Sequence, residues 1–242
     1  LNESNYSLEE LLRTVIPAEL ELPSAYEAVG HIAHLNLRQE LLPYRKAIGE
    51  AILAKVKPIR TVVNKLKTID AVYRTFDMEL LAGEDNYDVE LVECNCRFRF
   101  NFRKVYWNSR LQVEHLRIVE ACSPSDKVCD MFAGVGPFAI PLAKKGCTVY
   151  ANDLNPASYE ALVDNAKRNH VKSLKAYNMD AREIVRQLCA GQTQFCFNVV
   201  LMNLPKDAVE FLDVFVGCMP NLADGAPLPT IYCYAFCKPE SD

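Results

Sequence analysis

A glycine-rich turn is the segment of this sequence best suited to hold a ligand. It reads Asp130-Met131-Phe132-Ala133-Gly134-Val135-Gly136-Pro137-Phe138. Because the turn follows a short apolar run, bare backbone at Gly134 and Gly136 is expected at the carboxyl end of a strand, where open α/β sheets bind ligands. A dinucleotide fingerprint needs a third glycine at the right spacing, and Pro137 follows Gly136 directly, so NAD is a poor candidate.

Three aspartates stand where successive strands are expected to end, namely Asp130, Asp153 and Asp180. A carboxylate at Asp153 can accept both hydroxyls of a ribose, and one at Asp180 can accept a hydrogen bond from an adenine amino group. Each aspartate alone could equally be a helix N-cap. Their joint placement beside the glycine turn fits an adenosyl ligand that lacks a pyrophosphate.

The elements that would position these aspartates alternate along the second half of the chain. Strands are expected at 127–132, 147–151, 174–178 and 197–202, and helices up to 142, at 156–169 and at 181–188. Such alternation predicts a doubly wound, mostly parallel sheet, and thus an α/β fold.

The first half has a different pattern. Helices are expected over 8–15 and 41–55, and strands over 61–65, 76–83, 88–93 and 97–102, where β-branched and aromatic residues lie between turn signals. This predicts a smaller α+β domain with an antiparallel sheet. We place the boundary near residue 120, which gives domains 1–120 and 121–242.

Composition excludes several classes of protein. Half of the 242 residues are hydrophobic and 24% are charged, as in an ordinary folded domain. The sequence has no apolar run of about 18 residues and no signal-peptide pattern at its start, so we expect neither a membrane span nor secretion. The ten cysteines are irregularly spaced. We expect a reducing, intracellular compartment, which leaves the cytoplasm, the nucleus and the mitochondrial matrix open.

Two basic stretches stand out against the formal net charge of −4. Residues 38–67 contain eight Lys or Arg and two acids, and residues 97–117 contain six and one. These stretches could follow the phosphates of a nucleic acid, or they could be ordinary solvated surfaces.

Four segments together resemble the archaeal and eukaryotic tRNA (guanine-N1)-methyltransferase family, a group of class I S-adenosylmethionine-dependent methyltransferases. These segments are Val105-Tyr106-Trp107-Asn108-Ser109-Arg110-Leu111, Phe132-Ala133-Gly134-Val135-Gly136-Pro137-Phe138, Asn152-Asp153-Leu154-Asn155-Pro156 and Met202-Asn203-Leu204-Pro205. The resemblance implies a Rossmann-like catalytic domain and methylation of the guanosine 3′ of the anticodon, position 37. It also implies the cofactor S-adenosyl-L-methionine, its product S-adenosyl-L-homocysteine, and the tRNA anticodon stem-loop as partner. We further expect a monomer without membrane association.

The resemblance also assigns catalytic roles. Neutral guanine carries a proton on N1, so methylation there needs a base and a positive group near O6. Glu114 corresponds to the proposed base, Arg74 to the O6-stabilising arginine, and Asn203 to a residue that orients the guanine. Without the resemblance, Glu114 reads as an exposed helical glutamate and Arg74 as a surface residue. Residues expected to bind the cofactor are Tyr106, His115, Asp130, Phe132, Gly134, Gly136, Asp153, Leu154, Asp180 and Asn203.

Some alternatives stay open at this stage. Tyr106 and Trp107 could stack on a base or pack in a core. His31 and His34 lack further ligands at zinc spacing, so we expect no metal.

Family members carry an additional small domain before the point where this chain starts, and further strands after 230–237, so we expect a fragment or a divergent short form. Rival functions are the wybutosine-pathway aminocarboxypropyl transferase and a non-catalytic tRNA-binding module.

Overall fold

The structure is a computed structural model that describes residues 6–23, 25–69, 73 and 75–237. Its contacts divide the chain into two compact units. Unit 1 comprises residues 1–91 and 99–109, and unit 2 comprises residues 92–98 and 110–242. Residues 110–120, which the sequence pattern placed before the domain boundary, group with unit 2.

Unit 1 is built on a mixed sheet with the strand order β1-β2-β3-β4. The pairs β1/β2 and β3/β4 are antiparallel, and β2/β3 is parallel. The four strands predicted in this half of the chain are all present, and β3/β4 are antiparallel as expected. The expectation of a purely antiparallel sheet was wrong, because two earlier strands join the sheet and β2/β3 is parallel. The elements in chain order are α1 (Leu8–Arg13), β1 (Glu27–Val29), β2 (Ile32–Leu35), η2 (Gln39–Tyr44), α2 (Arg45–Lys55), β3 (Thr61–Ile69) and β4 (Phe76–Gly83).

Helix α2 explains the parallel pair in this sheet, because a parallel connection needs a crossover element. Ile48 and Ile52 of this helix are buried in one cluster with Leu35 of β2 and Val62 of β3. The predicted single helix over 41–55 is instead a 3₁₀ segment that contains Pro43, followed by α2. Proline lacks the N–H that an α-helical interior requires.

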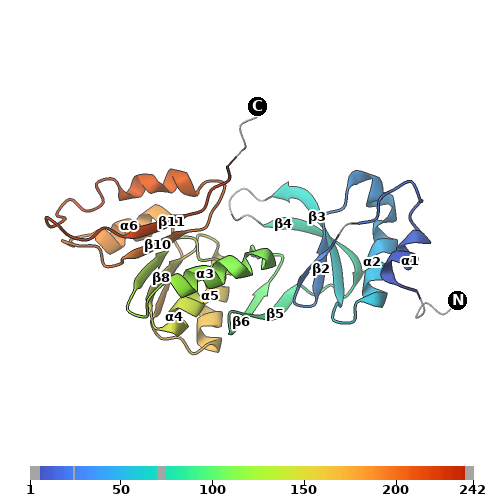
Figure 1. Ribbon diagram of the computed structural model, residues 1–242, viewed down its shortest axis with the longest axis horizontal. Helices are drawn as coiled ribbons and strands as arrows, with labels where there is room; N and C mark the ends of the chain where they lie inside the picture. The colour runs from blue at the N-terminus through green and yellow to red at the C-terminus, as the bar shows by residue number, and fades with distance from the viewer. Residues whose placement is uncertain (1–5, 24, 70–72, 74, 238–242) are drawn as a thin grey trace. The chain divides into compact units, whose positions relative to one another are not determined.

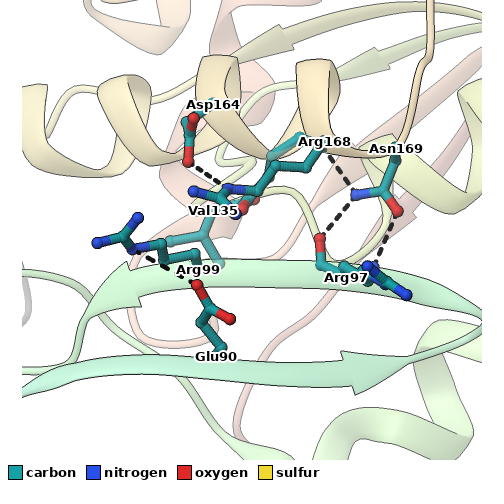
Figure 2. A network of polar contacts seen from close by, with 8 residues as sticks. Glu90, Arg97, Arg99, Val135, Asp164, Arg168 and Asn169 are labelled. Carbon is teal, nitrogen blue, oxygen red and sulfur yellow. Dashed lines mark hydrogen bonds and ion pairs between the residues drawn. The ribbon is translucent and has the colours of Figure 1, made fainter.

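Strands β5 (Asp88–Glu93) and β6 (Cys96–Asn101) form a separate two-stranded ribbon. Its turn uses left-handed backbone at Cys94 and Asn95, with φ of 47° and 57°. The tip of the ribbon is held within unit 2 by Asn169, whose side-chain amide bonds both backbone groups of Arg97 at 2.8 and 2.7 Å (Figure 2). The amide thus acts as a substitute for a strand partner.

Unit 2 contains a parallel sheet with the strand order β11-β10-β7-β8-β9 (Figure 1). This is the doubly wound order, so the predicted α/β fold class is confirmed. Its strands are β7 (Lys127–Asp130), β8 (Thr148–Asn152), β9 (Leu174–Tyr177), β10 (Val199–Met202) and β11 (Thr230–Cys233). Its helices are α3 (Gln112–Ala121, after the 3₁₀ turn η3, Ser109–Leu111), α4 (Ala139–Lys145), α5 (Pro156–Arg168), α6 (Ala181–Cys189) and the 3₁₀ segment η4 (Ala208–Phe215).

Helix α6 and η4 pack over the sheet in one buried cluster. Val185 of α6 and Val214 of η4 join Cys129 of β7 and Val200 of β10 in this cluster. Since side chains alternate along a strand, Asp130 points to the side opposite Cys129. Over the residues that the structure describes, no helix combines the length and apolar character needed to cross a membrane.

Candidate active site

The sheet order brings the ends of the central strands together. Asp130 at the end of β7 is in register with Ala151 of β8 and with Leu201 of β10. Asp153 directly follows β8, and Asn203 directly follows β10. The sequence-predicted residues Asp130, Asp153 and Asn203 therefore lie along one edge of the sheet.

The glycine turn has the backbone that only glycine adopts without strain. Gly134 and Gly136 have φ of 56° and 100°. A Cβ at Gly136 would lie 2.7 Å from Ile140 and 2.8 Å from Leu162, whereas one at Gly134 would meet nothing within 4 Å. Gly136 thus allows close packing of the turn against α4 and α5, and Gly134 borders open space.

Asp153 is tied to this turn through its carboxylate. Oδ2 accepts a hydrogen bond from the Gly134 N–H at 2.7 Å, and Oδ1 accepts one from the Asn155 N–H at 2.9 Å. Burial raises the pKa of Asp153, and these two backbone N–H groups oppose the shift. The carboxylate is consequently fixed in direction beside the open space at Gly134.

Asp130 is fully buried. Among the described residues, neither of its carboxylate oxygens has a partner that meets hydrogen-bond geometry. Burial raises the pKa of Asp130 to about 8, against the lowering effect of the nearby Phe132 backbone N–H, and the charge of Asp153 adds to the rise. A buried acid whose oxygens lack a well-aligned donor, at the carboxyl edge of a parallel sheet, is typical of a functional position.

Two buried asparagines to which sequence reasoning gave no role of their own hold this edge in place. The Asn152 side chain donates to the carbonyls of Met131 and Met179 at 3.2 and 3.0 Å, and accepts from the Met179 N–H at 3.2 Å. Asn165 of α5 donates to the carbonyl of Val135 in the glycine turn at 3.1 Å. Asparagine at buried positions of a strand and a helix was the available signal, since buried amides need partners.

The remaining residues of unit 2 that were expected to bind the cofactor differ in their exposure and contacts. Asp180 is exposed and caps α6 by accepting from the Arg182 N–H at 2.8 Å. Leu154 is 47% exposed. The Phe132 ring packs edge-on against Phe211, with centroids 5.0 Å apart. The cofactor contacts expected of these residues stay predictions.

Glu114 lies in the first turn of α3, where its carboxylate has two partners. Oε1 accepts from the Tyr234 hydroxyl at 2.6 Å. Arg117 approaches with both arms, Nη2 at 2.6 Å from Oε1 and Nε at 2.7 Å from Oε2. The Arg117 guanidinium, followed by the Tyr234 hydroxyl, lowers the pKa of Glu114 despite partial burial. These two donors therefore hold the Glu114 carboxylate in its ionised form.

Tyr234 links Glu114 to the segment that carries Asn203. It directly follows β11, and its backbone N–H donates to the carbonyl of Met202 at 3.1 Å. Phe236 similarly donates to the carbonyl of Pro205 at 3.3 Å. Sequence reasoning missed Tyr234, because 120 positions separate it from Glu114.

His115 is enclosed rather than open to a ligand. It is 2% exposed, and its Nδ1 lies 2.5 Å from Oε1 of the buried Glu93. Its ring packs edge-on against Phe138, with centroids 4.6 Å apart. Helix α3 is thereby joined to the end of the glycine turn, whereas a direct cofactor contact of His115 stays a prediction.

Of the other site candidates, Arg74 lies outside the described residues. Tyr106 is in unit 1 and is 44% exposed. Trp107 is 5% exposed and stacks on Phe100 with centroids 5.0 Å apart, as the core-packing alternative expected.

The two histidines considered for metal binding contact protein groups. His31 Nε2 lies 3.2 Å from the carbonyl of Asn86, and His34 Nε2 lies 3.4 Å from Glu27. Across the described part of the chain, no three His, Cys, Asp or Glu side chains gather in a way that could hold a metal ion.

Comparisons with known proteins point in one direction. Residues 90–223 match the model of the TRM5/TYW2 methyltransferase domain, and residues 8–86 match that of the TYW2 N-terminal domain. A tRNA (guanine(37)-N(1))-methyltransferase of Phytophthora infestans is 49% identical over 237 residues. The crystal structure of Trm5b from Pyrococcus abyssi is 35% identical with a TM-score of 0.74, and aTrm5 in its complex with tRNALeu is 30% identical with a TM-score of 0.75.

These similarities extend over most of this chain but not over most of the relatives. They cover 98% of the chain and 57% of the Phytophthora protein, 89% and 63% for the Pyrococcus protein, and 93% and 65% for aTrm5. The chain thus spans less than two thirds of each of these relatives.

Proposed function

Because the chain belongs to the TRM5/TYW2 methyltransferase family, we propose that the protein transfers a methyl group from S-adenosylmethionine to N1 of guanosine 37 in tRNA. The observation that supports this most is the ionised carboxylate of Glu114. It lies in the same unit as the glycine turn, and Phe138 connects the two by packing against both His115 and Tyr234. A base and a cofactor site are thus held in one framework.

The residues at the glycine turn fit an adenosyl cofactor. Space is open at Gly134, and each Asp153 oxygen keeps a lone pair beyond the one that its backbone partner uses. We assign the ribose hydroxyls to Asp153 and the adenine amino group to Asp180, with Leu154 as an apolar contact. When bound, S-adenosylmethionine supplies a methyl group on a positively charged sulfur.

Glu114 would remove the proton from guanine N1. The electron pair left on N1 would form the new N–C bond while the electron pair of the C–S bond stays on the sulfur, which leaves in neutral S-adenosylhomocysteine. The proton would stay on Glu114. Arg74 would stabilise the negative charge on O6, and the Asn203 amide would orient the base. The three residues after Asn203 are Leu204, Pro205 and Lys206, so no aromatic side chain follows it directly that could stack on the base.

Transfer RNA is the substrate we propose. The two basic stretches of the sequence supply cations for its phosphates. Binding that depends on phosphate contacts weakens steeply as salt rises, which gives this part of the proposal its own measurement.

A second candidate is transfer of the aminocarboxypropyl group of the same cofactor. The match of residues 8–86 to the TYW2 N-terminal domain favours it. The 49% identity to a guanine-N1 methyltransferase, together with the positioned carboxylate of Glu114, favours methyl transfer.

The test is to incubate the full-length protein with unmodified tRNA and S-adenosylmethionine labelled in its methyl group, and then to identify the labelled nucleoside. We expect 1-methylguanosine, which disappears when residue 37 of the tRNA is adenosine. A parallel reaction uses S-adenosylmethionine labelled in its aminocarboxypropyl group, and label that enters tRNA only in that reaction would support the second candidate. Binding of tRNA and cofactor with no label transferred in either reaction would show a non-catalytic module.

A further inference from the structure

Tyr234 connects three parts of the candidate site in unit 2. Its hydroxyl donates to Glu114 Oε1 at 2.6 Å, and its backbone N–H donates to Met202, the residue before Asn203, at 3.1 Å. Its ring lies 6.1 Å from that of Phe138, which follows the glycine turn. The base, the base-orienting loop and the cofactor turn therefore share Tyr234 as a neighbour.

We propose that Tyr234 is the positioning residue for the general base Glu114, and that it leaves Oε2 as the oxygen that receives the guanine N1 proton. This inference rests on the proposed function of Glu114. Tyr234 does not itself take or give a proton in the reaction. It fixes the direction of the carboxylate through one hydrogen bond.

The distribution of donors over the two oxygens supports this choice. Oε1 has two donors, Tyr234 and Arg117, whereas Oε2 has one, the Nε of Arg117. If the guanidinium leaves, Oε2 becomes open and Oε1 remains held by the phenol. The geometry thus keeps the hydrogen bond from Tyr234 to Oε1 when the bond from Arg117 to Oε2 is removed.

Exposure shows which contact can leave. The Arg117 side chain is 56% exposed, so solvent can replace its contact with Glu114. Tyr234 is half-buried, and burial together with its bond to Glu114 raises the pKa of its phenol. The phenol consequently stays a donor throughout the pH range in which the enzyme would work.

The experiment compares Tyr234→Phe with Tyr232→Phe in the full-length protein. Both remove one hydroxyl, but Tyr232 lies two residues earlier, where its ring is 6.0 Å from the Arg117 guanidinium. With saturating tRNA and cofactor, we expect Tyr234→Phe to slow single-turnover methyl transfer about 10-fold, a typical effect of one lost hydrogen bond to a charged group. Tyr232→Phe should match the parent in rate, and both variants should stay folded and keep the parental cofactor affinity.

The pH dependence separates positioning from a structural effect. The Tyr234 hydrogen bond lowers the pKa of Glu114, so its loss should raise that pKa. The rising acid limb of the pH–rate profile should therefore move to higher pH in Tyr234→Phe and stay in place in Tyr232→Phe. A parental rate and an unmoved limb in Tyr234→Phe would overturn the inference.

A double variant tells the failure of this inference from the failure of the proposed function. If Tyr234 acts through Glu114, Glu114→Gln/Tyr234→Phe should be no slower than Glu114→Gln. A further 10-fold loss in the double variant would mean that Tyr234 acts on its own, which overturns positioning. A parental rate in Glu114→Gln alone would instead remove Glu114 as the base, and with it the premise of this inference.

Discussion

The cofactor half and the acceptor half of the candidate site are built differently. At the glycine turn, side chains hold backbone groups: the buried Asn152 bonds Met131 and Met179, and the partly buried Asp153 bonds Gly134. Around Glu114, the contacts are between side chains, and one of them is the exposed Arg117. The first half is held by hydrogen bonds to backbone groups, whereas the second includes one exposed partner that can be exchanged.

This difference fits two different tasks. A site that binds the same cofactor in every cycle binds it more tightly when the site is preorganised, since little freedom is then lost on binding. A general base must have one oxygen available at the moment when the substrate base arrives. Variants in the cofactor half should therefore be impaired in cofactor binding or stability, and variants in the acceptor half in the rate of methyl transfer.

The largest effect is expected in the acceptor half. Glu114→Gln keeps the size of the side chain but cannot take the N1 proton, so single-turnover methyl transfer should slow by about 10²–10⁴-fold. Raising the pH should recover part of the loss, because guanine then approaches its own ionisation. Glu120→Gln, an exposed position on the same helix, is the matched control and should react at the parental rate.

In the cofactor half, Gly136→Ala should destabilise the fold by about 2–4 kcal/mol. The left-handed backbone contributes about 1–2 kcal/mol, and the added methyl group overpacks Ile140 and Leu162. Gly134→Ala carries the backbone strain without the clash, so chemical denaturation should show a smaller loss of about 1–2 kcal/mol. Equal losses in the two variants would contradict the tight packing assigned to Gly136.

A smaller, pH-dependent effect is expected at Asp130. In the unfolded chain this aspartate loses its proton near pH 4, but in the folded protein burial keeps the proton until about pH 8. Between these values the folded state binds more protons, so stability falls as pH rises. Asp130→Asn removes this titration.

The unfolding free energies of Asp130→Asn and the parent should therefore diverge between pH 5 and pH 8. The variant should gain about 1–3 kcal/mol relative to the parent over this range, measured by urea denaturation in the absence of cofactor. A constant difference across the range would mean that Asp130 is already ionised in the folded protein.

The sequence was sufficient for the parallel sheet and insufficient for the mixed one. Alternating strands and helices in unit 2 are local patterns, and they predicted the strand ends at Asp130, Asp153 and Asn203. In unit 1, β1 and β2 are only three and four residues long, and all four residues of β2 are buried, so no alternation marks them. The parallel pairing of β2 with β3 depends on how α2 packs, which no local pattern contains.

The candidate site, like the fold, has residues that could be predicted from the sequence and residues that could not. The residue types at the glycine turn carry recognisable chemistry, so they could be proposed from sequence, whereas Glu114 was proposed only through the family resemblance. Asn152, Asn165 and Tyr234 act by bonding groups that are distant along the chain, and only the folded structure identifies those partners. The enclosure of His115 between Glu93 and Phe138 is likewise a tertiary property.

The most direct test is calorimetric titration of S-adenosylmethionine, without tRNA, against the parent, Asp153→Ala and Glu114→Gln. Loss of the carboxylate should weaken binding in Asp153→Ala by about 1–3 kcal/mol, because the polar partners it leaves are unpaired. Glu114→Gln should bind the cofactor with parental affinity, although it is expected to be the slowest variant in methyl transfer. Unchanged affinity in Asp153→Ala, or an equal loss in both variants, would contradict a site built from two separate halves.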